Sequence, residues 1–179
     1  MGEIYLGESK ILDEGQRNFI IHEISALKRI TAKKTRLIYS SEQKTPKLIT
    51  EYIVSNPNMI VIAELANKRV VGAFTQNAFS KDNKMTQSSI VSKAIIFSLH
   101  SQAFITNDGK GEAIHFEENA LVWGNREFVI NCEEEPSISI NLNCENAVYP
   151  TEYSNKEFLG SDADRVPIVR LEAHRSFFG

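Results

Sequence analysis

The feature that most constrains the fold is a series of short β-prone runs in the second half of the chain. Most of them follow one another at intervals of about 8–12 residues, a spacing typical of β-sandwiches and barrels. The predicted strands are 93–99, 103–107, 112–117, 120–123, 127–132, 137–142 and 166–174. Because such intervals leave no room for crossover helices, we expect neighbouring strands to pair antiparallel. Pro167 predicts a strand beginning or a sheet edge, since proline cannot donate to the ladder.

The first half of the chain adds helices to this pattern. A helix is predicted over 13–30, where Asp13 and Gln16 have the spacing of a capping box and apolar residues then recur on one face. A β-prone run follows at 35–41. Pro46 can begin a second helix, because proline suits the first helical turn.

The middle of the chain predicts a hairpin and a loop. The β-branched runs 59–66 and 70–75 are separated by Asn67 and Lys68, which indicates a tight turn although glycine is missing from it. The stretch 76–89 is rich in Lys, Asn, Gln and Ser and predicts a long polar loop.

These elements together predict an α+β fold that is mainly β. We expect a two-sheet antiparallel β-sandwich flanked by two or three short helices, in a single domain over residues 1–179. The chain has 179 residues, of which 42% are hydrophobic. A chain of this length can bury a sizeable core without disulfides or a structural metal.

Charge and cysteine usage limit the classes of function. Twenty Lys and Arg against twenty-three Asp and Glu give a net charge of −3, which argues against a globally basic nucleic-acid binder. No apolar run is long enough to span a membrane, and the first residues do not have the pattern of a secretory signal. With two cysteines and no glycosylation sequon, the expected location is the cytoplasm, with the nucleus as an alternative.

The two cysteines are predicted to be reduced and unpaired. Cys132 and Cys144 fall in one predicted hairpin around 133–136. If Cys132 faces Ser137, Cys144 lies too far along the strand for a disulfide. Three glutamates follow Cys132 and would raise its pKa, so a redox-active thiol is not predicted.

No catalytic, metal or cofactor site is predicted. The four histidines have no metal-ligand spacing, and the common hydrolase, phosphate-binding and dinucleotide-binding motifs do not occur. His115 and Glu117 are weak acid/base candidates, because alternate residues of a strand share a face. The plain alternative is a solvated strand end.

A basic run lies near the end of the first predicted helix. Its residues are Lys28, Arg29, Lys33, Lys34 and Arg36. These charges could contact nucleic-acid phosphates, or they could complement the dipole at a helix C-terminus and otherwise lie in solvent.

The order of these segments resembles a TLDc domain, the module shared by oxidation-resistance proteins. The resembling segments are 37–41 (LIYSS), 60–79 (IVIAELANKRVVGAFTQNAF), 94–99 (AIIFSL) and 158–178 (FLGSDADRVPIVRLEAHRSFF). Gly72 within the second segment predicts a bulge or the close approach of another backbone. Residues 85–90, MTQSSI, stand where a Gly-x-Gly-Glu element is expected in the family.

The resemblance implies a two-sheet sandwich that protects against oxidative stress and, in several members, binds the vacuolar proton-pumping ATPase. The leading hypothesis is therefore a non-catalytic intracellular module that acts in a stress response through a protein partner. One alternative is a regulatory protein that binds DNA through the basic segment 28–36. A third is a weak hydrolase that uses His115 and Glu117.

Overall fold

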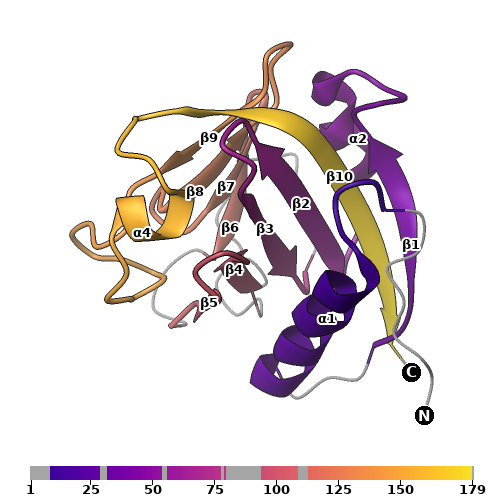
Figure 1. Ribbon diagram of the computed structural model, residues 1–179, viewed down its shortest axis with the longest axis horizontal. Helices are drawn as coiled ribbons and strands as arrows, with labels where there is room; N and C mark the ends of the chain where they lie inside the picture. Colours follow the sequence, from indigo (N-terminus) through magenta and orange to yellow (C-terminus); the bar gives the residue numbers. More distant parts are fainter. Residues whose placement is uncertain are drawn as a thin grey trace.

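Figure 1 shows the computed structural model, which describes residues 9–28, 32–53, 56–77, 79, 94–108 and 113–178. Its helical elements are α1 (Glu14–Lys28), the 3-10 helix η1 (Pro46–Leu48), α2 (Ile49–Ile53) and α4 (Asn155–Leu159). Its strands are β1 (Ala32–Ser40), β2 (Met59–Leu65), β3 (Val70–Thr75), β4 (Ala94–Ser98), β5 (Ala103–Thr106), β6 (Ile114–Glu117), β7 (Ala120–Trp123), β8 (Phe128–Asn131), β9 (Ser137–Ile140) and β10 (Val166–Phe178).

The long strand β10 joins two antiparallel sheets. Its first residues, Val166 and Pro167, pair with β9, and the residues from Ile168 onward pair with β2 and β1. The large sheet has the order β5-β4-β3-β2-β10-β1, and the small sheet continues from β10 through β9, β8 and β7 to β6. β10 arches from one sheet to the other in Figure 1. The predicted antiparallel sandwich is confirmed, and Pro167 lies at a strand beginning.

Aromatic side chains fill the space between the sheets. The ring of Trp123 on β7 meets those of Phe79 and Phe128 edge-on, with centroids 5.4 and 5.3 Å apart, and Phe128 contacts Phe158 of α4 at 6.2 Å. All four side chains are buried. Burial of each side chain contributes roughly 1.5–3 kcal/mol in favour of the folded state.

Helix α1 covers the opposite face of the large sheet. Residues along β2 alternate, so Val61 faces the core between the sheets while Ile60 and Ile62 face the helix. Ile20 and Ile24 of α1 are buried against this face. The predicted helix over 13–30 is thus observed as Glu14–Lys28, with Ile20 and Ile24 of its apolar face buried.

The β2–β3 hairpin has the predicted turn at Asn67 and Lys68. The amide of Leu65 donates to the carbonyl of Arg69 (2.8 Å), and the amide of Lys68 donates to that of Leu65 (2.9 Å). Lys68 adopts φ 70°, the left-handed region in which glycine is favoured. Lys68 therefore occupies the turn position at which glycine is usually found.

Gly72 of β3 is explained by close approach and not by a bulge. It pairs in regular register with Ile62 on one side and Phe97 on the other. A Cβ at this position would lie 2.3 Å from the carbonyl oxygen of Val61 and 2.6 Å from Cζ of Phe97. Any larger residue must therefore displace either a backbone or a packed ring.

One sequence prediction cannot be compared with the structure, and one observed helix was not predicted. Most of the predicted loop 76–89 lies outside the described residues. Helix α4 was not predicted, although Ser154 and Glu157 form a capping box and Gly160 ends the helix at φ 76°. Among the helices in the described ranges, none has the length and apolar character needed to cross a membrane.

Candidate functional site

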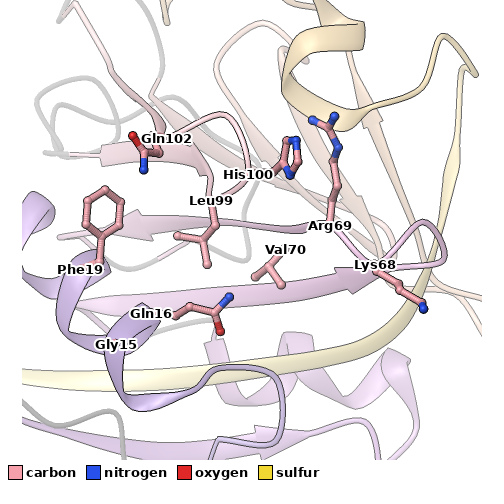
Figure 2. Close-up of a pocket in the computed structure, with 9 residues that line it drawn as sticks. All are labelled: Gly15, Gln16, Phe19, Lys68, Arg69, Val70, Leu99, His100 and Gln102. Atoms are coloured by element: carbon pink, nitrogen blue, oxygen red, sulfur yellow. The ribbon is translucent and has the colours of Figure 1, made fainter.

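A groove of about 350 Å³ lies beside the N-terminal half of α1, and we call it the α1 groove (Figure 2). Its lining residues come from α1, from the β2–β3 turn and from the β4–β5 turn: Gly15, Gln16, Phe19, Lys68, Arg69, Val70, Leu99, His100 and Gln102. In Figure 2 the side chains of Val70 and Leu99 lie between Gln16 and His100. The groove therefore combines an apolar floor with polar rims.

One backbone hydrogen bond joins the two turns at the rim, and a second closes the β4–β5 turn. The amide of Leu99 donates to the carbonyl of Val70 (3.0 Å), and the amide of Gln102 donates to that of Leu99 (3.1 Å). Gln102 adopts φ 53°, and Lys68 has a similar left-handed backbone. An L-residue pays about 1–2 kcal/mol for this conformation. Each turn thus has a long polar residue, Lys68 or Gln102, at a position where glycine would adopt the backbone conformation at lower free energy.

Arg69 is fixed against α4. Its guanidinium donates to the carbonyl of Glu157 (3.0 Å) and approaches the hydroxyl of Ser101 (3.5 Å). The guanidinium also lies over Gly160, where a Cβ would come within 2.3 Å of Nε. A cation at the C-terminal carbonyls of a helix interacts favourably with them. These partners are neutral, so the arginine charge is not balanced by a carboxylate there.

The helix side of the groove begins at a capped N-terminus. The amide of Gln16 donates to Oδ1 of Asp13 (2.8 Å), and the amide of Asp13 donates to Oε1 of Gln16 (3.0 Å). This reciprocal pair confirms the predicted capping box. Gly15 lies in the same turn, and a Cβ there would meet only Oδ1 of Asp13, at 3.4 Å.

His115 and Glu117, the predicted acid/base candidates, lie together on β6. Nε2 of His115 is 3.1 Å from Oε1 of Glu117, and Arg126 forms an ion pair with the other carboxylate oxygen. The hydrogen bond from Arg126 is the largest cause that lowers the pKa of Glu117. A carboxyl group held ionised in this way is poorly suited to act as a general acid. Neither residue lines the α1 groove.

Of the five residues of the predicted basic surface, only Arg36 has a side chain that the structure describes. Arg36 is exposed on β1. Arg29 lies outside the described residues, and so do the side chains of Lys28, Lys33 and Lys34, although their backbone belongs to α1 and β1. The structure therefore gives no geometry for a phosphate-binding surface over 28–36, and this surface stays a prediction.

Both cysteines are unpaired, as predicted. The assumed register was wrong by one residue, because Asn131 and not Cys132 pairs with Ser137. Burial raises the pKa of the Cys132 thiol to about 12, and burial followed by the nearby charge of Glu127 raises that of Cys144. Neither thiol is activated as a nucleophile.

A buried polar pair on β10 was missed by sequence reasoning. Glu172 and His174 are both buried on the face under α1, with Nε2 of the histidine 3.1 Å from Oε1 of the glutamate. Glu172 also accepts hydrogen bonds from the hydroxyl of Ser9 and the amide of Lys10, both 2.7 Å. Glu172 therefore attaches the segment before α1 to strand β10 of the large sheet.

Glu127 has a comparable structural role at the other end of the molecule. Its buried carboxylate accepts hydrogen bonds from the amides of Val148 (2.7 Å), Tyr149 (2.6 Å) and Asn125 (3.2 Å). These bonds attach the segment before α4 to the β7–β8 turn. Within the described ranges, no group of three His, Cys, Asp or Glu residues is placed to hold a metal ion.

The fold and the site define an antiparallel β-sandwich with a helix-flanked groove and two thiols that are not activated. The sequence pattern of the TLDc domain matches residues 5–176. The chain therefore belongs to the TLDc domain family, as its resemblance suggested. A comparison with curated proteins found no match to this chain.

Proposed function

We propose that this protein is a non-catalytic interaction module that acts in the oxidative-stress response by binding a protein partner. The observation that carries the proposal is the TLDc match over nearly the whole chain. By family resemblance, the first partner to test is the vacuolar proton-pumping ATPase. The proposed location is the cytoplasm or the nucleus.

The state of the thiols supports a role through binding. A cysteine that reacts with peroxide needs a lowered pKa and access to solvent. Cys132 is buried with a pKa raised to about 12, and the pKa of Cys144 is also raised. Protection from oxidation by this chain is therefore better explained by a partner than by direct thiol chemistry.

The test is affinity capture with the tagged full chain from cells with and without peroxide treatment. A Gly72→Val variant is the control, because its side chain must clash with Val61 and Phe97 and disrupt the native surface. We expect proteins that bind the wild type and not the control. The purified candidate, beginning with the ATPase, should then bind the purified chain directly.

Two results would contradict the proposal. One is capture of the same proteins by the wild type and by Gly72→Val, which indicates binding to unfolded chain. The other is specific, salt-sensitive binding of a short DNA duplex that disappears when Lys28, Arg29, Lys33, Lys34 and Arg36 are changed to Gln. That second result would favour the nucleic-acid alternative.

A further inference from the structure

We infer that the α1 groove docks an acidic segment of a partner protein, with an apolar side chain on the groove floor and carboxylates at the rim. This inference rests on the proposed function, since it supplies the surface and the chemistry through which the module binds. The occupant is an extended peptide in which Asp or Glu stands beside an apolar residue.

The titratable side chains that line the groove are all basic. Its described lining has three basic side chains, Lys68, Arg69 and His100, and no Asp or Glu. In the part of the chain that the structure describes, no carboxylate forms an ion pair with any of the three. By contrast, Arg165 pairs with Glu133 on another part of the surface. A basic rim that no carboxylate of the described residues neutralises is complementary to an acidic ligand.

The rim is also pre-organised. Arg69 is fixed by the carbonyl of Glu157 and packs over Gly160, so its charge is held on the α4 side of the groove before any ligand binds (Figure 2). Lys68 and Gln102 stand at turn positions with φ 70° and 53°. Strained backbone of this kind is found where side chains are held for binding. Ordering the guanidinium of Arg69 in advance lowers the entropic cost of association.

The floor distinguishes a peptide from a simple anion. Val70 and Leu99 form it, and Phe19 adds an aromatic wall that packs edge-on against Phe104 with centroids 5.7 Å apart. An inorganic anion or a nucleic-acid phosphate would use only the rim. A volume of about 350 Å³ lies at the lower end of the range for binding pockets, which suits one apolar side chain and its neighbours.

Gly15 supplies a variant that blocks the groove and leaves the fold intact. A Cβ at this helical position meets only Oδ1 of Asp13, at an ordinary 3.4 Å, so the backbone accepts a side chain there. Because Gly15 lines the groove, we expect the ring of Gly15→Trp to occupy part of it. Replacement of glycine in a helix also favours the helical state. The urea midpoint of Gly15→Trp should therefore equal or exceed that of the wild type.

The first experiment selects ligands without assuming a cellular partner. A library of random short peptides is selected on the wild-type protein and counter-selected on Gly15→Trp. We expect the recovered peptides to share Asp or Glu next to Leu, Ile or Phe. Recovery of neutral or basic peptides, equal binding to Gly15→Trp, or no recovery at all overturns the inference.

The second experiment measures the contribution of rim charge to the affinity of a selected peptide. Lys68→Glu should weaken binding by about tenfold, because it removes one attraction and adds a repulsion. Lys47→Glu makes the same charge change at exposed η1 and should leave the affinity unchanged. Equal effects of the two variants would contradict docking at the groove. The ligand class is tested by competition. If a DNA duplex displaces the selected peptide as effectively as an acidic protein segment does, the inference that the ligand is an acidic peptide is wrong.

Failure of this inference can be told apart from failure of the proposed function. If the wild type captures a partner from cells and Lys68→Glu captures it equally, the docking surface is wrong and the function stands. If the selected peptides bind as expected and the wild type captures no specific partner, the groove chemistry stands and the function is wrong.

Discussion

Two histidine–glutamate pairs in this molecule share one local geometry and differ in their surroundings. In each, the residues are two apart on one strand, with Nε2 3.1 Å from Oε1. The His115–Glu117 pair lies on β6, at the end of the small sheet, with side chains 23% and 38% exposed. The Glu172–His174 pair lies on β10, between β1 and β2, with exposures of 2% and 0%. The two-residue spacing on a strand brings histidine and glutamate into contact in both pairs. The position of the strand in the sheet determines how far the pair is buried.

The partners of the Glu117 and Glu172 carboxylates also differ in their exposure to solvent. Glu117 is paired with the exposed guanidinium of Arg126, in contact with water. For Glu172, burial acts to raise the pKa, but hydrogen bonds from His174, the Lys10 amide and Ser9 outweigh it, so the pKa lies below its usual value. Removal of a partner should therefore lower the free energy of unfolding more at Glu172 than at Glu117.

The largest expected effect is that of Glu172→Ala. The substitution leaves the Ser9 hydroxyl, the Lys10 amide and His174 without their buried acceptor. Breaking a buried pair costs about 3–5 kcal/mol, and we expect that loss in the free energy of unfolding measured with urea. If Glu172→Ala does not fold, Glu172→Gln keeps the shape and tests the charge alone. A loss of less than about 1 kcal/mol in both variants, as at an exposed pair, would remove the distinction between the two pairs.

The second expected effect is on acid stability. Because the folded pKa of Glu172 is lowered, its contribution is fully present above the unfolded value of about 4.3 and is lost as the pH falls through the folded pKa. The urea midpoint of the wild type should therefore fall below about pH 4, and Glu172→Gln should fall less steeply. Glu117→Gln is the matched control, and its pH profile should follow the wild type more closely. Parallel profiles for the wild type and Glu172→Gln would show that other carboxylates control acid unfolding.

The third expected effect is that of Ser9→Ala. The hydroxyl of Ser9 donates to Glu172 and accepts from the amides of Ile11 and Leu12. Loss of these bonds should reduce the free energy of unfolding by about 1 kcal/mol, less than Glu172→Ala does. Amide hydrogen exchange at Leu12 should become faster while exchange in β7 does not change. Unchanged exchange at Leu12 would mean that Ser9 does not hold this segment to β10.

Local patterns predicted the strands and the β2–β3 hairpin, because alternation and turn residues are local properties of a sequence. The groove could not be predicted in this way, since Phe19, Lys68 and Leu99 meet only through sheet topology and helix packing. For β10, the prediction 166–174 ended short of Phe178, because pairing with β1 extends the strand beyond its apolar pattern.

The histidine–glutamate pairs show the same limit for single residues. His115 and Glu117 were acid/base candidates because alternate residues of a strand share a face, and a solvated strand end was the alternative. His174 two residues after Glu172 has the same spacing, and only the placement of β10 beneath α1 reveals that this pair is buried. By contrast, the capping box of Ser154 and Glu157 was visible in the sequence and could have identified α4.

The smallest expected effect is that of Glu117→Ala, which separates the exposed pair from the buried one. The substitution removes the carboxylate that His115 and Arg126 share, but both side chains remain accessible to water. An exposed ion pair contributes about 0–1 kcal/mol, so the urea midpoint should move little, and added salt should reduce the difference further because ions screen exposed charges. Glu172→Ala, measured in the same buffers, should keep most of its effect at high salt. A loss at Glu117 as large as that at Glu172 would mean that the strand spacing of the pair, and not its burial, sets its energetic weight.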